Sequence, residues 1–277
     1  MTFNLGGKFE INRIGYGAMQ LTGKGAFGEI QDQENAINLL QTAISSGVNF
    51  IDTAEAYGPH TNEILIKKAL YPYKEDLVIA TKGGLFRPGP FQWKYNGNPD
   101  FIRKNIESSL ERLQIESIIL WQLHRIDPEV PIKKTLEPVL DAVNTGKIKF
   151  VGLSEVSIDQ LKAVEEILPI VSVQNLYNLS IRKWEDMVDY TASRNIAFIP
   201  WHPLHSGKLS LSEKIRDIAI AHDATVYQIA LAWLLKRSYN IILIPGTKSL
   251  THLIENLKSA DIRLSDSEFT EISKAMY

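Results

Sequence analysis

The sequence contains no cysteine among its 277 residues. Disulfide bonds, thiolate zinc sites, iron–sulfur clusters and a cysteine nucleophile are therefore excluded, and a reducing compartment fits this composition. No apolar run approaches the roughly 18 residues needed to span a membrane, and the N-terminus lacks the basic start and apolar core of a secretion signal. We expect a cytoplasmic protein that does not insert into membranes.

Net charge is also small. The formal net charge is −2, and the lysine and arginine residues are scattered, which argues against nucleic acid as a partner. Apolar residues make up 44% of the chain, enough to fill a large core. No low-complexity linker or shift in composition divides the chain, so we expect a single domain over residues 1–277. The sequence leaves the oligomeric state unknown.

What the sequence does contain is an alternation of short apolar runs and longer amphipathic stretches, which is typical of βα units around a parallel sheet. Segments such as 33–48 and 100–115 carry apolar residues at helical spacing, and 224–238 is the most apolar of them. Eight such units in this length predict an α/β fold, a (β/α)₈ TIM barrel. The predicted strands are residues 13–20, 48–53, 76–82, 117–124, 148–154, 170–175, 196–202 and 240–246.

Polar residues stand at the ends of several predicted strands. The carboxyl ends of barrel strands face one mouth, where barrel enzymes build their active sites. Asp52, Lys82 and His124 end three strands, and Tyr57 follows Asp52 by five positions. Each residue alone has a structural alternative, such as a helix cap, a solvated strand end or loop packing. Together, the four residues indicate acid–base chemistry.

The physical reason lies in the tyrosine. A phenol with a pKa near 10 is a weak acid at neutral pH, and a lysine ammonium about 4 Å away could lower that pKa by roughly three units before desolvation opposes it. Lys82 would supply this charge to Tyr57, and Asp52 would hold Lys82 charged and oriented. His124 would orient a substrate carbonyl through a ring nitrogen.

The segments that carry these residues resemble the aldo-keto reductase family over the whole chain. They read GYGAMQ, FIDTAEAYG, ATKGG, LWQLHR, VGLSE, VQNLYN, WHPLHSG and IPGTKSLTHLIENL. The resemblance implies an NAD(P)H-dependent oxidoreductase that reduces an aldehyde or ketone to an alcohol. It assigns the catalytic tetrad to Asp52, Tyr57, Lys82 and His124, with Tyr57 as the proton donor. The runs GYGAMQLTG and QLHRIDP look most like a microbial branch that includes pyridoxal reductases, so pyridoxal is the first substrate expected, beside other aldehydes.

The same resemblance implies a nicotinamide cofactor, NADPH in preference to NADH. Ser154 and Gln174 would bind its carboxamide, Trp201 would stack on its ring, and the phosphate end would lie along residues 245–256, where a helix N-terminus suits an anion. The implied cofactor contacts are Gly17, Ala18, Met19, Asp52, Ser154, Gln174, Trp201, Pro203, Leu204, Gly207, Lys208, Gly246, Thr247, Lys248, His252, Glu255 and Asn256. The substrate would contact Phe86, Trp93 and Trp201, walled by the long loop 83–99.

Two positions depart from the usual pattern of that family. Glu155 follows Ser154 where asparagine is frequent, which places a negative charge near the carboxamide site. His252 stands where many members carry an arginine for the adenosine phosphate. A neutral imidazole binds phosphate less well than a guanidinium, so the expected preference for NADPH over NADH is weaker here.

Three alternatives stay open at this stage. Residues 23–28 match the dinucleotide pattern G-x-G-x-x-G, but the next helix is expected only near Asp32, which favours a flexible loop. His202 and His205, with His124 or Asp52, could form a metal site, but the pattern lacks helical context and no metal is expected. A nicotinamide-binding regulatory subunit with little turnover is the third alternative, and the complete tetrad argues against it.

Overall fold

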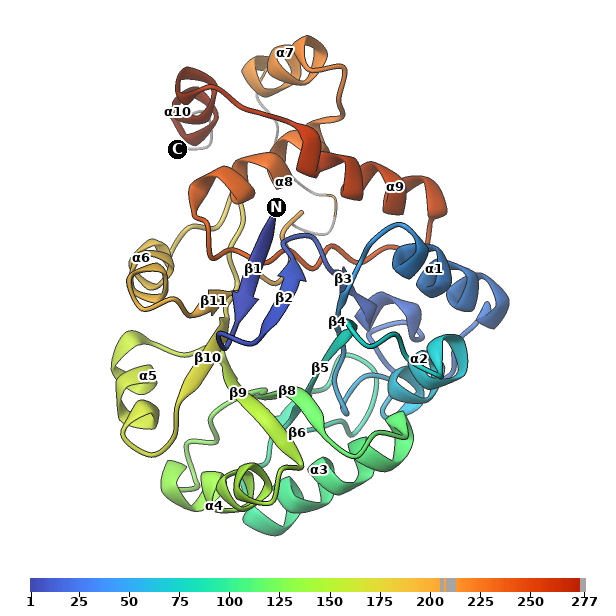
Figure 1. Cartoon of the computed structure of the whole chain (residues 1–277), viewed down its shortest axis with the longest axis vertical. Coiled ribbons are helices and arrows are strands. Elements are labelled where there is room, and N and C mark those ends of the chain that lie inside the picture. The colour runs from blue at the N-terminus through green and yellow to red at the C-terminus, as the bar shows by residue number, and fades with distance from the viewer. Residues whose placement is uncertain (205–206, 208–212, 275–277) are drawn as a thin grey trace.

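The structure, a computed structural model, describes residues 1–204, 207 and 213–274. A curved sheet of parallel strands lies at its centre, in the order β11-β10-β9-β8-β5-β4-β3, and helices surround it (Figure 1). The predicted α/β barrel is therefore confirmed. The strands are β3 (Tyr16–Gly17), β4 (Phe50–Asp52), β5 (Val78–Gly83), β8 (Ile118–Leu123), β9 (Ile148–Ser154), β10 (Ile170–Gln174) and β11 (Ala197–Phe198).

The eighth predicted strand, residues 240–246, closes the ring without forming a regular strand. Isolated parallel bridges join Ile241 to Phe198 of β11 and Leu243 to Ile14, just before β3. Backbone hydrogen bonds support both, from Ile242 N to Phe198 O at 2.9 Å and from Leu243 N to Arg13 O at 2.8 Å. The prediction of a regular strand here was wrong, because the pairing is limited to single bridges on each side.

Predicted strands 13–20 and 196–202 are also much shorter in the structure, at two residues each. The first one turns at Gly17 into the 3₁₀ helix η1 (Ala18–Leu21). A side chain is excluded at this turn, because a Cβ on Gly17 would lie 2.5 Å from Ile244 O and one on Gly246 would lie 2.6 Å from Gly17 O. Glycine therefore lets the first and last segments of the barrel approach closely at its mouth.

The helices follow the amphipathic segments of the sequence. Asn98 caps α3 with Pro99 in its first turn, and Thr225 and Gln228 form a capping box on α8. Every residue of α8 from Gln228 to Leu235 is buried, which confirms the prediction for segment 224–238. The helices are α1 (Gln33–Ser45), α2 (Thr61–Leu70), α3 (Pro99–Leu113), α4 (Ile132–Asn144), α5 (Ile158–Glu165), α6 (Glu185–Ser193), α7 (Glu213–Ala221), α8 (Val226–Arg237), α9 (Leu250–Lys258) and α10 (Asp266–Lys274), with the 3₁₀ turn η3 (Ser259–Asp261).

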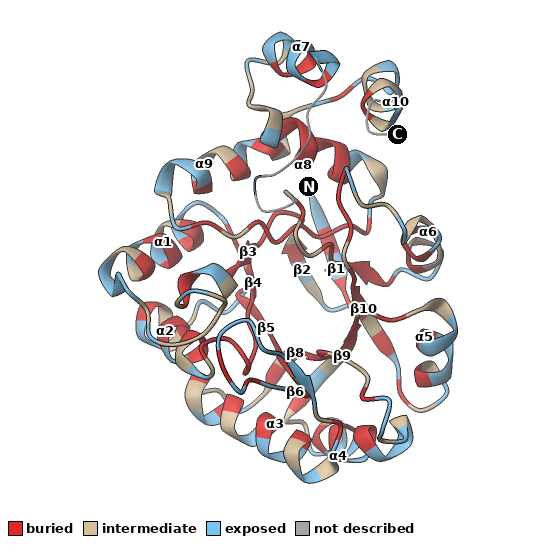
Figure 2. Ribbon diagram, turned by 180° about the vertical axis from the view of Figure 1, so that it is seen from behind, coloured by how far each residue is buried: buried red, intermediate tan, exposed pale blue. Residues whose placement is uncertain are grey.

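Burial separates the two faces of these helices. Figure 2 shows buried residues along the strands and on the helix faces turned to them, with exposed residues on the outer faces. Among the described residues, no single helix is long and apolar enough to cross a membrane, and α7 and α8 reach that length and hydropathy only as a pair bent by 88°.

An antiparallel hairpin of β1 (Thr2–Leu5) and β2 (Phe9–Asn12) covers the amino end of the barrel (Figure 1). Asn12 anchors it there through hydrogen bonds to Gly47 and Asn49, which precede β4. Its apolar side chains, including Leu5 and Ile11, join one core cluster with side chains of β4, β5, β8 and β11. The hairpin was not predicted, although alternating Phe3, Leu5, Phe9 and Ile11 around a Gly-Gly turn are a hairpin signal.

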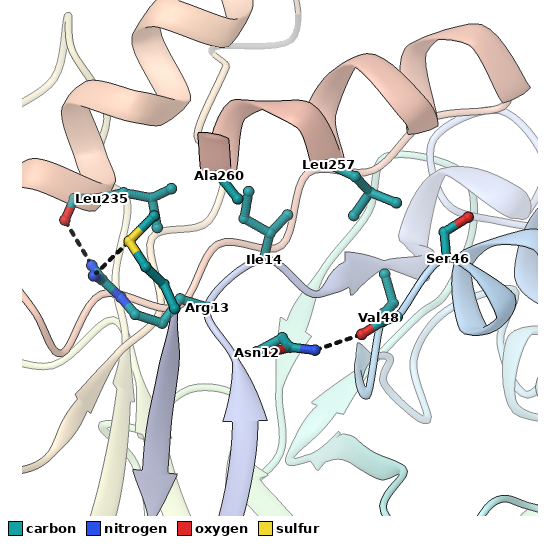
Figure 3. A pocket seen from close by; sticks show the side chains of 10 residues that line it. Asn12, Arg13, Ile14, Ser46, Val48, Leu235, Leu257 and Ala260 are labelled. Carbon is teal, nitrogen blue, oxygen red and sulfur yellow. Dashed lines mark hydrogen bonds between the residues drawn. The ribbon is translucent and has the colours of Figure 1, made fainter. Parts of the chain in front are cut away.

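A cavity of about 170 Å³ lies beside this hairpin, at the amino end of the barrel. Figure 3 shows Arg13 reaching the C-terminal end of α8, where its guanidinium donates to Leu235 O at 2.8 Å. Arg13 Nε also donates to Ile241 O at 3.0 Å. The carbonyl dipoles at a helix C-terminus stabilise a buried cation, so this arrangement ties the hairpin to α8 and is structural.

Candidate active site

Four side chains from neighbouring segments meet at the carboxyl end of the barrel. Lys82 Nζ, from β5, donates to Asp52 Oδ1 at the end of β4 (2.6 Å) and to Thr53 O (2.7 Å), and lies 3.5 Å from the hydroxyl oxygen of Tyr57. The ring of His124, just after β8, stands edge-on to the ring of Tyr57 at a centroid distance of 5.9 Å. The structure thus brings together all four residues of the predicted tetrad.

Lys82 is fully buried, yet it stays charged. Burial disfavours the ammonium, but the charge of Asp52 and the phenol of Tyr57 outweigh burial and raise the pKa of Lys82. Asp52 therefore holds a permanent cation next to Tyr57, as predicted.

The pKa of the Tyr57 phenol is set by two opposing effects. Burial has the largest effect and raises the pKa of its phenol above the usual 10, although Lys82 acts in the opposite direction. Lys82 thus acts in the expected direction, but desolvation outweighs it, because the phenol is only 5% exposed and loses more solvation than one cation restores. Tyr57 is consequently a protonated donor throughout the neutral range.

A hydrogen-bond network around Asp52 fixes the ion pair of Asp52 and Lys82. Asp52 Oδ2 accepts from Gln174 Nε2 at 2.8 Å and from Gln122 Nε2 at 3.3 Å. Gln122 was not among the predicted site residues. The sequence does carry a signal for it: Gln122 lies on β8 two positions before His124, which directly follows the strand, and alternation along extended chain turns both side chains to one face.

His124 is held neutral. Burial is the main cause, and the cations Lys82, Arg125 and Arg87 add to it, so the pKa of His124 lies well below 6.5. Its Nδ1 is buried without a hydrogen-bond partner in the part of the chain that the structure describes. A neutral imidazole beside Tyr57 can donate one ring N–H to a substrate oxygen.

The residues expected to hold a nicotinamide carboxamide offer the donor and acceptor that such a group needs. Ser154 Oγ accepts from Arg125 at 2.9 Å, which leaves its own O–H to donate. Gln174 donates its amide to Asp52, and its Oε1 has no partner among the described residues and is not sealed from solvent. One donor and one acceptor side by side match an amide, so these residues fit the implied cofactor.

Trp201, expected to stack on the nicotinamide ring, is partly exposed just after β11. Its indole Nε1 donates to Glu155 Oε1 at 2.7 Å, and the same carboxylate oxygen accepts from the backbone N–H of Leu176. Glu155 has the left-handed φ of 54°, a conformation costly for a residue with a side chain. The Glu155 carboxylate, which was expected to place a negative charge near the carboxamide site, therefore orients the ring of Trp201.

The segment expected at the phosphate end joins the last part of the barrel to α9. Thr247 O accepts from the hydroxyl of Tyr16 at 2.6 Å, and Lys248 Nζ donates to Thr22 O at 3.3 Å. Ser249 caps α9 by accepting from His252 N. The α9 N-terminus and Lys248 thus provide the positive potential that a phosphate requires.

The remaining predicted cofactor contacts are spread around this rim and stay predictions. Gly17, Ala18 and Met19 run from β3 into η1. Pro203, Leu204 and Gly207 follow β11, Glu255 and Asn256 belong to α9, and Gly246 precedes it. Lys208 and His205 lie outside the described residues.

The loop 83–99 folds into a small hairpin of β6 (Leu85–Phe86) and β7 (Lys94–Tyr95). Trp93 reaches the site, with its ring 6.4 Å from that of Tyr57 and 6.0 Å from that of His124. Phe86 is 49% exposed and pairs with Lys94 across the hairpin. Trp93 therefore lies where a substrate wall was predicted, whereas the role of Phe86 stays a prediction.

Arg87 holds this hairpin against the rest of the mouth. Its guanidinium stacks on Trp93 at 3.5 Å and donates to Gln92 O at 2.8 Å, Ala26 O at 2.9 Å and Gly25 O at 2.6 Å. The loop 23–28 is thus a packed part of the mouth, and α1 begins only at Gln33, so the glycines lie outside any helix N-terminus. This fits the loop interpretation of the G-x-G-x-x-G pattern.

A metal site has no counterpart in the described residues, where no three histidine or acidic side chains gather closely enough to hold an ion.

Comparison with known proteins points to one family. Residues 13–276 match the sequence model of the aldo/keto reductase family. The chain is 46% identical over 269 residues to an uncharacterised oxidoreductase of Schizosaccharomyces pombe, covering 97% of this chain and 88% of that protein. It is 40% identical over 271 residues to pyridoxine 4-dehydrogenase of Escherichia coli, covering 96% and 94%.

Solved structures agree with the sequence matches. A thermostable aldo-keto reductase superposes with a TM-score of 0.89 at 30% identity and covers 99% of both chains. An aldo-keto reductase of Klebsiella pneumoniae in complex with NADPH superposes with a TM-score of 0.84 at 25% identity, covering 99% of this chain and 94% of that one.

Proposed function

The chain belongs to the aldo/keto reductase family, and we propose that it reduces an aldehyde or ketone to the alcohol with NADPH as hydride donor. Membership makes it an NAD(P)H-dependent oxidoreductase. The observation that carries the proposal is the contact of Lys82 Nζ with Asp52 at 2.6 Å and Tyr57 at 3.5 Å. A single domain over residues 1–277 is part of the proposal, supported by the family match over residues 13–276.

NADPH, when bound, supplies a hydride to the carbonyl carbon. Tyr57 gives its phenolic proton to the carbonyl oxygen, so that hydride and proton together make the alcohol. The Lys82 ammonium stabilises the phenolate that Tyr57 leaves behind, and Asp52 keeps Lys82 charged and in place. A ring N–H of His124 orients the carbonyl oxygen and remains neutral, because the pKa of His124 is well below 6.5.

The cofactor would be held by residues that are already in place. Ser154 and Gln174 would bind the carboxamide, Trp201 would support the nicotinamide ring, and the N-terminus of α9 with Lys248 would receive the phosphates. NADPH is proposed over NADH because Lys248 can meet the 2′-phosphate, and the Klebsiella relative crystallised with NADPH supports this.

Pyridoxal is the first substrate proposed. The 40% identity to a pyridoxine 4-dehydrogenase supports it, since that name describes the same carbonyl–alcohol pair. Trp93 at the mouth provides an aromatic surface for a flat ring. Other aromatic and aliphatic aldehydes belong to the same proposed class.

The proposal is tested by measuring oxidation of NADPH and of NADH with a panel of carbonyls that includes pyridoxal. We expect turnover with NADPH and its loss in Tyr57→Phe, with Tyr239→Phe, a change at an exposed tyrosine far along the sequence, as the control. Tight binding of NADPH without turnover on any carbonyl would overturn the proposal and favour the regulatory-subunit alternative.

A further inference from the structure

Arg125 follows His124 at the end of β8 and is partly buried at the mouth of the barrel. Its Nη1 donates to His124 O and to Ser154 Oγ, the latter at 2.9 Å. Its Nε and Nη2 have no hydrogen-bond partner among the described residues, and neither is sealed from solvent. Two donors in the fixed plane of the guanidinium are therefore free to bind an acceptor at the mouth.

The charges around Arg125 do not cancel. Asp52 pairs with Lys82, and Glu155, whose Oε1 accepts from Trp201 and Leu176, also acts electrostatically on Arg125. These two carboxylates face three cations at the mouth: Lys82, Arg87 and Arg125. Within the described chain, neither Arg87 nor Arg125 has a carboxylate at ion-pair distance, and the donors of Arg87 go to backbone carbonyls. Both arginines act electrostatically on His124. The mouth thus carries an excess of positive charge, which favours an anionic ligand.

The same mouth offers flat apolar surface. Trp93 is 39% exposed and stands edge-on to Tyr57 and His124, the two groups proposed to meet the carbonyl oxygen. Tyr95 is also exposed and lies within electrostatic range of Arg125. An aromatic ring carrying the carbonyl can therefore pack against Trp93 while its carbonyl oxygen meets Tyr57 and His124.

We propose that Arg125 determines substrate specificity by binding an anionic oxygen on the ring carbon next to the carbonyl-bearing carbon of an aromatic aldehyde. An oxygen at this position lies within hydrogen-bond reach of the carbonyl oxygen. The free Nε and Nη2 donors can bind it while Tyr57 and His124 bind the carbonyl. This inference rests on the proposed reduction and names its substrate class: ortho-oxy aromatic aldehydes, of which pyridoxal, with a hydroxyl beside its aldehyde, is one.

The test compares 2-hydroxybenzaldehyde with 2-methoxybenzaldehyde, which keeps an oxygen beside the carbonyl but carries a methyl group in place of the acidic proton. The quantity measured is the ratio of the two kcat/KM values, at a pH that ionises the hydroxyl, in wild type and in Arg125→Met. We expect the ratio to fall by about 10- to 100-fold in Arg125→Met, the range for a hydrogen bond to a charged group. Arg125→Lys, which keeps the charge but loses the planar fork, should retain part of the ratio.

The ratio separates specificity from damage. A general defect in folding or cofactor binding lowers both kcat/KM values equally, so an unchanged ratio in Arg125→Met overturns the inference. Arg103→Gln, an exposed arginine of α3, is the matched control and should leave the ratio unchanged.

Failure of the proposed reduction gives a different result. In that case neither aldehyde is turned over by wild type, and binding of 2-hydroxybenzaldehyde, at the pH that ionises its hydroxyl, is followed by tryptophan fluorescence instead. A larger dissociation constant in Arg125→Met than in wild type supports the inference, and equal dissociation constants overturn it.

Discussion

The indole N–H of Trp201 is fixed by the carboxylate of Glu155, with 2.7 Å between Nε1 and Oε1. Glu155 adopts a left-handed φ of 54° to reach it. A polar side chain in an unfavourable backbone conformation that holds one ring in place indicates that the orientation of that ring matters.

Glu155→Ala should release Trp201 and raise the KM for NADPH about tenfold with a smaller change in kcat, because the ring would have to be ordered by the cofactor itself. Glu155→Gln keeps an acceptor oxygen and should lie close to wild type. The control is Trp201→Phe, in which Glu155→Ala should have little further effect, since no indole N–H remains. Additive effects of the two changes would contradict this account. Steady-state kinetics with varied NADPH is the measurement.

Removal of the Lys82 charge should affect folding and catalysis separately. Lys82→Met leaves Asp52 buried without its cation and should cost about 3 kcal/mol of unfolding free energy. The double variant Lys82→Met/Asp52→Asn removes both charges and should recover much of that loss, measured by urea denaturation. Both variants should lose about 10²- to 10⁴-fold in kcat, because neither supplies an ammonium to Tyr57.

The matched control for this pair is Lys134→Met on α4, which breaks an exposed ion pair with Glu137. It should change the unfolding free energy by less than about 1 kcal/mol and leave kcat unaltered. A double variant with wild-type kcat would contradict the role given to Lys82.

The rate of carbonyl reduction should be nearly independent of pH between about pH 6 and pH 8. Burial raises the pKa of Tyr57, so its phenol keeps its proton over this range, and His124 stays neutral because its pKa is well below 6.5. Loss of activity should begin only in strongly alkaline solution, where the phenol ionises. A kcat/KM profile with 2-methoxybenzaldehyde measures this, and a step near pH 6.5 would show that His124 titrates in the free enzyme.

Glu55 should make the protein less stable as pH rises. It lies in the turn between Asp52 and Tyr57 and is 6% exposed, and burial raises its pKa to about 7, although Arg112 acts in the opposite direction. A carboxyl with a raised pKa holds its proton more tightly when folded, so ionisation between about pH 4.5 and pH 7 opposes folding.

Glu55→Gln should therefore raise the unfolding free energy at pH 8 by up to about 3 kcal/mol and have little effect at pH 4. Glu63 and Arg112 act electrostatically on Glu55, and His60 Nδ1 lies 3.3 Å from Glu55 Oε1; all three residues are unchanged in the variant. The exposed Glu75→Gln is the control and should show no pH-dependent gain. The measurement is urea denaturation of both proteins at pH 4 and pH 8. An equal change in unfolding free energy at the two pH values would contradict the role given to Glu55.

Much of the site follows from the sequence because strand ends in a barrel converge. Asp52, Lys82 and His124 could be placed together without knowledge of any distance. The net direction of the pKa of Tyr57 could not, because it depends on how completely the neighbouring chain buries the phenol. The contact between Glu155 and Trp201 also depends on a backbone conformation that no spacing encodes. Residues 240–246 were predicted to close the barrel as a regular strand. In the structure they close it through two isolated bridges.

The hairpin of β1 and β2 has a consequence for the order of events during turnover. Because it covers the amino end of the barrel, both reactants must use the opposite opening. Whichever molecule occupies the inner position has to arrive first and depart last. In the proposed arrangement the carboxamide meets Ser154 and Gln174, which are almost fully buried, while Trp93 is partly exposed at the rim. We therefore expect the dinucleotide to take the inner position, and the aldehyde to enter and the alcohol to leave while it stays bound.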